Sequence, residues 1–132
     1  MYIAVIMLIV WANLFVLRVG IIHGNSMYPA LRNRSIVLFW QWRYTPQVGD
    51  IVMLGSDTDF GSRIVKRIAA INGQYVYIDE MYFYVPKGYV FLIGDNRDES
   101  RDSRHYGPVR EEAIVGRVFL VYNVFRGDNE SD

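Results

Sequence analysis

Cysteine is absent from the 132-residue chain, and histidine occurs only twice. The first absence excludes disulfides, thiolate nucleophiles and cysteine-based zinc sites, and the second argues against a histidine-rich metal centre. An excess of charge is also absent, because 14 Lys and Arg residues balance 14 Asp and Glu residues. Nucleic-acid-binding proteins normally carry a basic excess. We therefore expect no metal site and no nucleic-acid partner.

Charge is also missing from the start of the chain, where residues 1–17 contain no Asp, Glu, Lys or Arg. Arg18 follows, and residues 19–22 complete an apolar block. Seventeen helical residues span roughly 25 Å, so the rest of the block is needed to approach the ~30 Å of a bilayer core. A cleavable signal peptide would show a basic start, and a buried core helix would show a polar stripe. We therefore expect a transmembrane anchor over residues 1–22.

After residue 22 the sequence changes to short apolar runs separated by Gly, Pro and Asp. Such runs are typical of β-strands, and no long stretch has a helical period. The pattern predicts a mainly β domain over residues 23–132. The expected strands are Ser35–Trp40, Asp50–Leu54, Arg63–Ile71, Tyr75–Asp79, Met81–Val85, Tyr89–Ile93 and Ala113–Tyr122.

A serine lies in a tight bend between Gly24 and Pro29, where a strand-like segment ends. Such a bend can expose the Oγ of Ser26 and aim a backbone N–H at the same point, as an acyl-transfer nucleophile requires. By itself the pattern is more typical of an ordinary turn serine.

A lysine interrupts the apolar run that begins at Arg63. On a strand, alternation places Lys66 between Ile64 and Ile68 on one face and Arg67 on the other. Burial there would lower the pKa of the Lys66 amine and make it usable as a base near neutral pH. The alternative is an edge-strand lysine whose amine reaches water, which this segment alone favours.

A loop rich in charges and hydroxyls, residues 94–109, follows an apolar strand. Asp102 and Arg104 can form an ion pair there, and Ser100 offers a hydroxyl that could orient a neighbouring group. A charge run of this kind is more often a solvated surface loop. A Ser-His-Asp triad that uses His105 and Asp102 is disfavoured, because residues packed within one loop seldom reach the required geometry.

Together and in this order, the three stretches resemble type I signal peptidases. The family's nucleophile motif G-x-S-M-x-P-T-L matches residues 24–31, with Ala30 in place of Thr. Its G-D-I-V strand matches residues 49–52, and its V-K-R-V/I lysine motif matches residues 65–68. Its last motif, G-D-N-R-x-x-S-x-D-S-R-x-x-G-x-V, matches residues 94–109 throughout. The resemblance implies one transmembrane helix followed by a mainly β catalytic domain of antiparallel sheets.

The resemblance also implies roles for single residues. Ser26 would be the nucleophile, with its backbone N–H as an oxyanion donor, and Lys66 would be the general base. Some members carry a second donor hydroxyl two residues before the nucleophile, where this chain has Gly24. Asp95 and Asn96 would shape the wall of the site.

Ser100 would orient the lysine amine, with Asp102 and Arg104 as a supporting ion pair. Shallow aliphatic pockets would take small substrate residues at −1 and −3, the Ala-x-Ala pattern of secretory signals. The side chains expected to line them are Ile22, Met27 and Ile64. The reaction so implied requires no cofactor or metal.

The resemblance places the protein in the cell membrane with a single pass and the catalytic domain on the extracytoplasmic side. Arg18 after the apolar block would by itself put that domain in the cytoplasm, but long domains can translocate regardless of local charge. The expected partners are secretory precursor proteins, the lipid bilayer and the protein-export channel.

The chain departs from the family at residues 70–74, where members usually have a G-L-P-G-D turn, and the segment up to Gly94 is shorter than in many members. These departures affect the expected substrate range more than the chemistry. Two alternative functions remain. A self-cleaving repressor also uses a Ser/Lys pair but would need a helix-turn-helix before this domain. An inactive membrane-bound binding module would not need to keep every residue of the site.

Aromatic side chains gather where the first expected strand, Ser35–Trp40, ends. Trp40, Trp42 and Tyr44 would share one face of an extended segment. A core-facing strand is one interpretation. The other is an exposed face at the lipid headgroup region, which Trp and Tyr favour.

Overall fold

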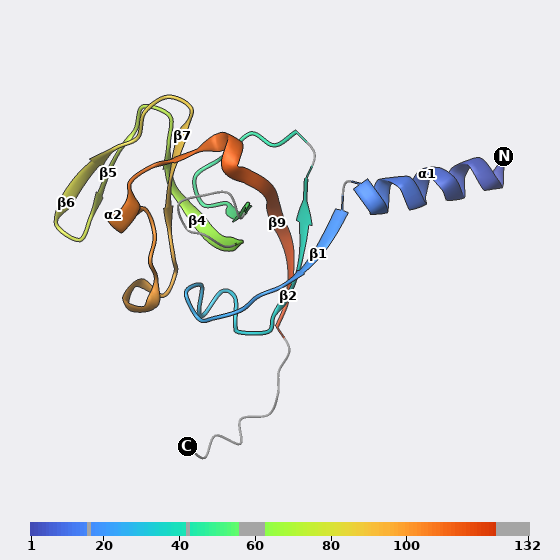
Figure 1. Cartoon of the computed structure of the whole chain (residues 1–132), viewed down its shortest axis with the longest axis horizontal. Coiled ribbons are helices and arrows are strands. Elements are labelled where there is room, and N and C mark those ends of the chain that lie inside the picture. Colours follow the sequence, from blue (N-terminus) through green and yellow to red (C-terminus); the bar gives the residue numbers. More distant parts are fainter. Residues whose placement is uncertain (16, 42, 56–62, 124–132) are drawn as a thin grey trace, which may run out of the picture.

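In a computed structural model of the chain, the described residues are 1–15, 17–41, 43–55 and 63–123. They form a seven-stranded sheet in the order β1-β2-β9-β3-β4-β7-β8 and a two-stranded sheet β5-β6 (Figure 1). The strands are β1 (Leu17–Ile21), β2 (Ile36–Trp40), β3 (Ile51–Leu54), β4 (Ile64–Ile71), β5 (Tyr75–Ile78), β6 (Met81–Tyr84), β7 (Tyr89–Ile93), β8 (Val109–Arg110) and β9 (Ile114–Tyr122). The helices are α1 (Tyr2–Phe15) and α2 (Ser103–Tyr106), with single 3₁₀ turns η1 (Arg97–Glu99) and η2 (Glu111–Ala113).

The predicted mainly β class with antiparallel sheets is confirmed. Every pairing between described strands is antiparallel. Each of the seven runs that the sequence predicted as strands contains one strand of the structure. The sequence did not predict β1 and β8, since β1 lies inside the apolar block and β8 has only two residues.

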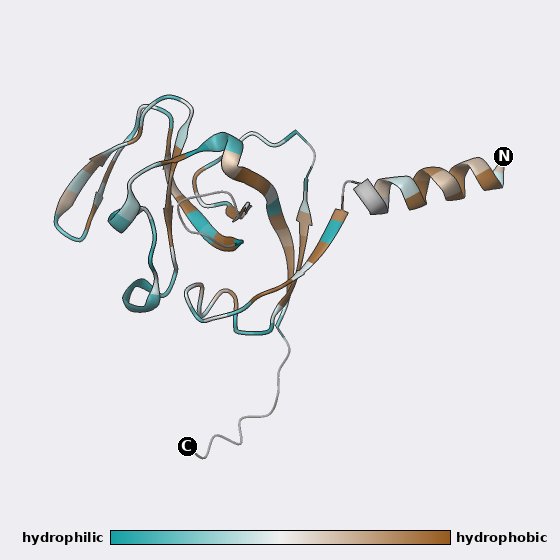
Figure 2. Ribbon diagram, viewed as in Figure 1, coloured by the Kyte–Doolittle hydropathy of each residue, from teal (hydrophilic) through white to brown (hydrophobic). Residues whose placement is uncertain are grey.

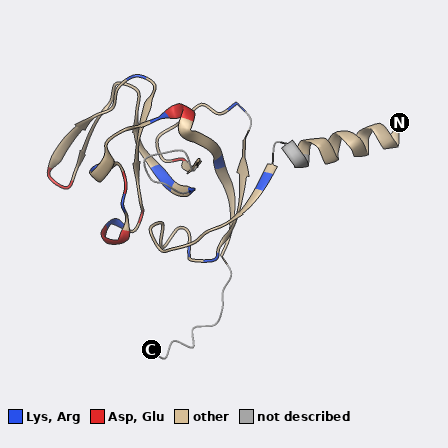
Figure 3. Cartoon of the chain, viewed as in Figure 1, with Lys and Arg blue, Asp and Glu red and all other residues tan. Residues whose placement is uncertain are grey.

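The N-terminal helix is shorter than the sequence predicted. α1 has 14 residues, projects away from the sheet and is uncharged (Figures 1 and 3). The apolar block then continues as β1, which pairs with β2 from Leu17↔Trp40 to Ile21↔Ile36. The expectation of one helix through Ile22 is therefore wrong, because backbone pairing with β2 takes residues 17–21 into the sheet. No helix in the described part of the chain is long and apolar enough to cross a membrane.

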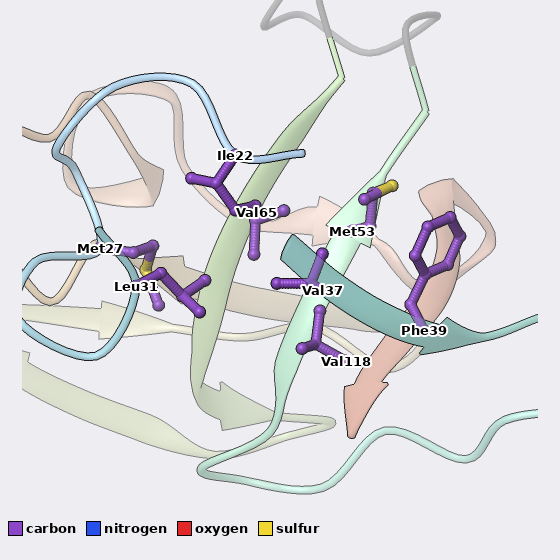
Figure 4. Close-up of a cluster of buried hydrophobic side chains, with 8 residues drawn as sticks. All are labelled: Ile22, Met27, Leu31, Val37, Phe39, Met53, Val65 and Val118. Carbon is purple, nitrogen blue, oxygen red and sulfur yellow. The ribbon is translucent and has the colours of Figure 1, made fainter. Parts of the chain in front are cut away.

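The largest core cluster lies between the turn after β1 and the strands β2, β3, β4 and β9. Alternation along β2 buries Val37 and Phe39, while Met27 and Leu31 reach the same cluster from the turn (Figure 4). Its full membership is Ile22, Met27, Leu31, Val37, Phe39, Met53, Val65 and Val118. The cluster therefore anchors the segment that carries Ser26 against the sheet.

Two further clusters complete the core. One joins β3, β4 and β7 through Val52, Ile68 and Leu92. The other packs the β5-β6 hairpin on β7, where Phe83 and Phe91 lie with ring centroids 4.8 Å apart. Strand β4 contributes to all three clusters through its alternating side chains. It is held rigidly between β3 and β7 as a result.

We expect Leu31→Ala to lower the free energy of unfolding by about 2–5 kcal/mol, because the Leu31 side chain is completely buried and its removal leaves a cavity. Leu120→Ala is the matched control, since Leu120 is 54% exposed and its removal should change stability by only about 0.5 kcal/mol or less. Denaturant titration followed by circular dichroism measures both. Equal losses for the two variants would contradict this account of the core.

Candidate active site

Ser26 and Lys66 open onto the same cavity, although 40 positions separate them in the sequence. The cavity has a volume of about 520 Å³ and lies between β1 with its following turn on one side and the start of β4 on the other. Its lining residues are Val19, Gly20, Ile21, Ile22, His23, Ser26, Met27, Phe39, Met53, Arg63, Ile64, Val65 and Lys66. The expected pocket residues Ile22, Met27 and Ile64 are among them.

The turn that carries Ser26 is fixed from both sides. Met27 and Leu31 are buried beneath it, and the Leu31 N–H donates to the Met27 carbonyl at 2.9 Å. From across the cleft, the Asn96 backbone N–H donates to the Ser26 carbonyl at 2.9 Å, and the Asn96 side-chain amide donates to the Asn25 carbonyl at 3.1 Å. Ser26 itself stays half-buried, so its position is set by its neighbours while its hydroxyl remains accessible.

Lys66 occupies the interior of β4, opposite Val52 on β3. Its neighbours two positions away, Ile64 and Ile68, pack in the same apolar cluster as Val52. The Lys66 side chain is only 4% exposed. Burial lowers the pKa of the Lys66 amine below its ordinary value, the charge of Asp102 opposes this shift, and Arg104 reinforces it.

Asp102 is completely buried and is the centre of a hydrogen-bonded network. Its Oδ2 accepts from the Ser100 Oγ at 2.8 Å and from the Gly94 N–H at 2.9 Å. Its Oδ1 accepts from the Arg104 Nε at 2.9 Å. Burial alone would raise the pKa of Asp102, but hydrogen bonds from Arg104, Gly94 and Ser100 outweigh it and hold the pKa below its usual value. Asp102 is therefore a stable anion in this site.

Arg104 is held by more groups than the sequence indicated. Its guanidinium donates to the Arg97 carbonyl at 2.7 Å and forms an ion pair with Asp79 at 2.8 Å. Asp79 lies in the turn between β5 and β6, so the hairpin contributes to the site's support. Sequence reasoning missed Asp79, because a contact over 25 positions leaves no local signal.

Gly94 allows the turn that carries Ser26 to lie close to Ser100. A Cβ at this position would lie 2.1 Å from the Ser100 Oγ and 2.6 Å from the Ser26 carbonyl oxygen. Any side chain would therefore force the Ser26 turn and Ser100 apart. The sequence contained this glycine within a matched motif, but only the packing reveals why the position requires glycine.

Asp95 and Asn96 follow β7 and are absent from the cavity lining, and their side chains make different contacts. Asp95 accepts two hydrogen bonds from Arg67, each at 2.8 Å, and these hydrogen bonds raise the pKa of Arg67. Arg67 also donates to the Gly49 carbonyl at 2.8 Å, which ties β4 to the turn before β3. Asn96 instead donates hydrogen bonds to the turn that carries Ser26, as described above.

The structure does not bring Gly24 or His105 into the chemistry. The Gly24 N–H donates to the Asn33 side chain at 3.1 Å, and Gly24 is absent from the cavity lining. His105 is about half-exposed, and its Nδ1 accepts from the Asp102 N–H at 3.4 Å, which caps α2. Because the Asp102 carboxylate faces Arg104 and Ser100, the triad alternative finds no support. Within the described ranges, His, Asp and Glu side chains form no group of three that could hold a metal ion.

Comparison with known proteins identifies the family of the chain. A family model described as "Signal peptidase, peptidase S26" matches residues 1–85 and 79–123. The chain belongs to the signal peptidase S26 family. S26 relatives include mitochondrial inner membrane protease subunit 1 of Mus musculus and of Homo sapiens, each 38% identical over 106 residues, which are 74% of this chain and 64% of the relative.

Mitochondrial inner membrane protease subunit 2 of Schizosaccharomyces pombe is 31% identical over 116 residues, or 80% of this chain. The chain thus spans slightly less than two thirds of the length of these S26 relatives. Among solved structures, a signal peptidase I from Enterococcus faecalis has a TM-score of 0.49 and 24% sequence identity, covering 58% of this chain and 98% of that chain.

We expect Lys66→Met to raise the free energy of unfolding at neutral pH by about 1–4 kcal/mol, the range for exchanging buried charged groups for apolar ones. Since the pKa of Lys66 is lowered on folding, the unfolded chain binds more protons between the folded pKa and 10.5, and wild-type stability rises with pH across that window. The gap between variant and wild type should therefore shrink as the pH approaches 10.5. Denaturant titrations at a series of pH values measure it.

Lys87→Met is the matched control, because Lys87 is exposed and is the other lysine of the chain. It should leave stability unchanged at every pH. A Lys66→Met variant that is less stable than wild type at neutral pH would contradict the burial argument, and so would a gap that does not change with pH.

Proposed function

We propose that the protein is a membrane-bound serine endopeptidase that removes N-terminal signal peptides from precursor proteins. One observation carries the proposal: Ser26 and a buried Lys66 line one cavity. A lysine whose pKa is lowered by burial can hold a neutral amine, and a neutral amine can take the proton of a serine hydroxyl. Membership of the S26 family supports the same reaction class.

The substrate would bind as an extended strand. β1 is at the edge of the seven-stranded sheet, and residues 19–21 of β1 face residues 63–66 across the cavity. A free strand edge offers backbone N–H and C=O groups to which an extended peptide can add. This places the scissile peptide bond of the substrate beside Ser26.

The reaction follows from these positions. The neutral Lys66 amine takes the proton from the Ser26 Oγ as that oxygen bonds to the scissile carbonyl carbon. The resulting oxyanion is stabilised by the backbone N–H of Ser26. When the carbon–nitrogen bond breaks, the Lys66 ammonium returns the proton to the leaving amine. Lys66 then deprotonates a water molecule, which hydrolyses the acyl-enzyme and regenerates Ser26.

Ser100 and Asp102 would keep the amine aimed at the nucleophile. The Ser100 hydroxyl donates its proton to Asp102, which leaves its oxygen lone pairs to accept from the Lys66 amine. The Asp102 charge would also stabilise the ammonium that forms in the transition state. Burial lowers the pKa of Lys66 against the effect of the Asp102 charge, and the Arg104 charge adds to that lowering.

Specificity would come from the apolar part of the cavity. Ile22 and Met27 are buried at its floor, and Ile64 is half-buried at its side. These side chains leave shallow space that suits small residues, as in the Ala-x-Ala pattern at −1 and −3. The −1 residue would sit next to Ser26, since it carries the carbonyl that Ser26 attacks.

Membrane attachment would come from α1, which is apolar and exposed along the length described (Figure 2). The relatives are named as proteases of the mitochondrial inner membrane, which supports a membrane location. An anchor within residues 1–22, a single pass through the cell membrane and a catalytic domain on the extracytoplasmic side stay predictions. The predicted partners, which are secretory precursors, the lipid bilayer and the protein-export channel, also stay predictions. Because β1 is part of the sheet, a soluble catalytic fragment should begin at Leu17 rather than at residue 23.

We expect Ser26→Ala and Lys66→Ala each to reduce precursor cleavage to less than about a hundredth of the wild-type rate, since general-base catalysis contributes ~10²–10⁴-fold. Lys66→His should not restore it, because the shorter imidazole does not reach the Ser26 Oγ. The measurement is cleavage of a precursor in detergent, with the new N-terminus of the product sequenced.

His105→Ala is the control in this assay and should keep the wild-type rate. Ser100→Ala should lower the cleavage rate, because the Lys66 amine would lose the hydroxyl that orients it. Circular dichroism establishes that each variant is folded. A folded Lys66→Ala variant with more than a hundredth of the rate would refute the general-base assignment. Wild-type protein without cleavage of any Ala-x-Ala precursor would favour the binding-module alternative.

We expect a precursor with Ala-x-Ala before the cleavage site to lose at least about fivefold in kcat/KM when the −1 Ala becomes Leu, because the larger side chain must displace Met27 or Ile22, and overpacking a site costs about 1–3 kcal/mol. The same change at −2 should be tolerated, since alternate side chains of an extended strand point away from the pocket. Competing the two precursors in one reaction measures the ratio. Equal losses at −1 and −2 would contradict the pocket assignment.

A further inference from the structure

The side of β1, β2 and β9 that faces away from the core is apolar. Its side chains form three rows that run across the three strands, as the strand registers show, and together we call them the outer face. Most of its members are strongly exposed, Val19 at 66%, Leu120 at 54% and Tyr122 at 66% among them. The rows are Leu17–Trp40–Arg117, Val19–Leu38–Leu120 and Ile21–Ile36–Tyr122. Arg117 is therefore the single charged member of the outer face.

A second cavity, of about 530 Å³, lies at the row that contains Arg117. It is next to the point where the chain passes from α1 into β1. Its lining residues are Leu17, Trp40, Arg43, Tyr44, Arg117 and Phe119. Two guanidinium groups thus share one cavity with aromatic and aliphatic side chains.

The cavity has a net positive charge that the neighbouring acid only partly balances. Asp50 lies 3.4 Å from the Arg117 Nε, beyond the usual ~2.7–3.2 Å of a hydrogen bond, and it also accepts from the Tyr44 hydroxyl and, at 3.2 Å, from the Gln47 N–H. Arg117 is half-exposed, and its guanidinium has N–H donors besides the Nε that lies near Asp50. Arg43 is exposed as well, and no acidic residue is among the cavity's lining.

We propose that this cavity binds the headgroup of an anionic phospholipid. Arg43 and Arg117 would donate to the phosphate oxygens, and Trp40, Phe119 and Leu17 would contact the glycerol and the start of the acyl chains. Guanidinium groups suit phosphate because they offer several donors in one plane. The proposal rests on the membrane location in the proposed function.

The surroundings favour a lipid over a free phosphate ion. Apolar walls add nothing to the binding of an ion but add buried area for a lipid. The outer face continues these walls, and the apolar helix α1 ends two residues before Leu17 (Figure 2). Because the other end of β1 lines the catalytic cavity, a lipid bound here would hold the substrate-binding edge at the bilayer surface.

The test is native mass spectrometry of the full chain, released from detergent with phosphatidylglycerol or phosphatidylcholine. We expect phosphatidylglycerol to be retained and phosphatidylcholine to be lost. Arg43→Gln combined with Arg117→Gln should weaken phosphatidylglycerol retention roughly 20-fold, since each arginine near an anionic lipid surface contributes about fivefold. Arg101→Gln combined with Arg110→Gln removes the same charge far from the cavity and should change nothing.

Two further measurements distinguish a phospholipid from a free phosphate ion as the ligand. Phe119→Ser keeps both arginines and should still weaken lipid retention, because it removes an apolar wall. Inorganic phosphate at millimolar concentration should not displace phosphatidylglycerol. Displacement by phosphate, or equal retention of phosphatidylcholine, would overturn the proposal. Wild-type retention by the double arginine variant would overturn it too.

The readout is independent of catalysis. Ser26→Ala should retain phosphatidylglycerol as wild type does, so a failed cleavage assay refutes the peptidase and a failed retention assay refutes the lipid site. Circular dichroism monitors folding of each variant. Should loss of Arg117 prevent folding, the Arg43→Gln variant decides alone, with a fivefold loss expected and an unchanged retention overturning the proposal.

Discussion

The buried Asp102–Arg104 ion pair is the interaction on which the rest of the site depends. A fully buried carboxylate is tolerated only if hydrogen bonds replace its lost hydration, and removing one partner of such a pair commonly costs about 3–5 kcal/mol. Here the replacements come from Arg104 in α2 and from Ser100 and the Gly94 N–H in the connection between β7 and α2. The charge thereby joins segments that have little apolar surface to hold them together.

The same ion pair sets the electrostatics at Lys66. Burial among Val52, Ile64 and Ile68 disfavours the ammonium, while Asp102 favours it and Arg104 disfavours it. Because Asp102 and Arg104 act in opposite directions, burial remains the dominant influence and the pKa of Lys66 stays lowered. Without Arg104, the Asp102 charge would raise the pKa of Lys66 further, although burial remains the larger influence. The pairing thus combines a supporting negative charge with a lysine that can act as a base.

Sheet order then relates the chemistry to the membrane. β1 is an edge strand that lines the cavity of Ser26 and Lys66 with residues 19–21 and the basic cavity with Leu17. Its Gly20 faces the core side chains Phe39 and Met53, and its outer side is part of the exposed apolar face. A single five-residue strand therefore links α1, the proposed lipid site and the substrate-binding edge.

The sequence by itself determined the mainly β class, seven of the eight strands that the structure describes after residue 22, and which side chains to examine around Ser26 and Lys66. Alternation, turn residues and motif spacing are local, so they can be read along the chain. Only the tertiary structure decided that residues 17–21 leave the apolar block for the sheet, because that choice depends on pairing with β2. Trp42 of the predicted aromatic face lies outside the described residues. Of the other two members, Trp40 is exposed, whereas the Tyr44 hydroxyl donates a hydrogen bond to Asp50. The Asp79–Arg104 pair was likewise decided by packing, since a partner 25 positions away leaves no pattern to read.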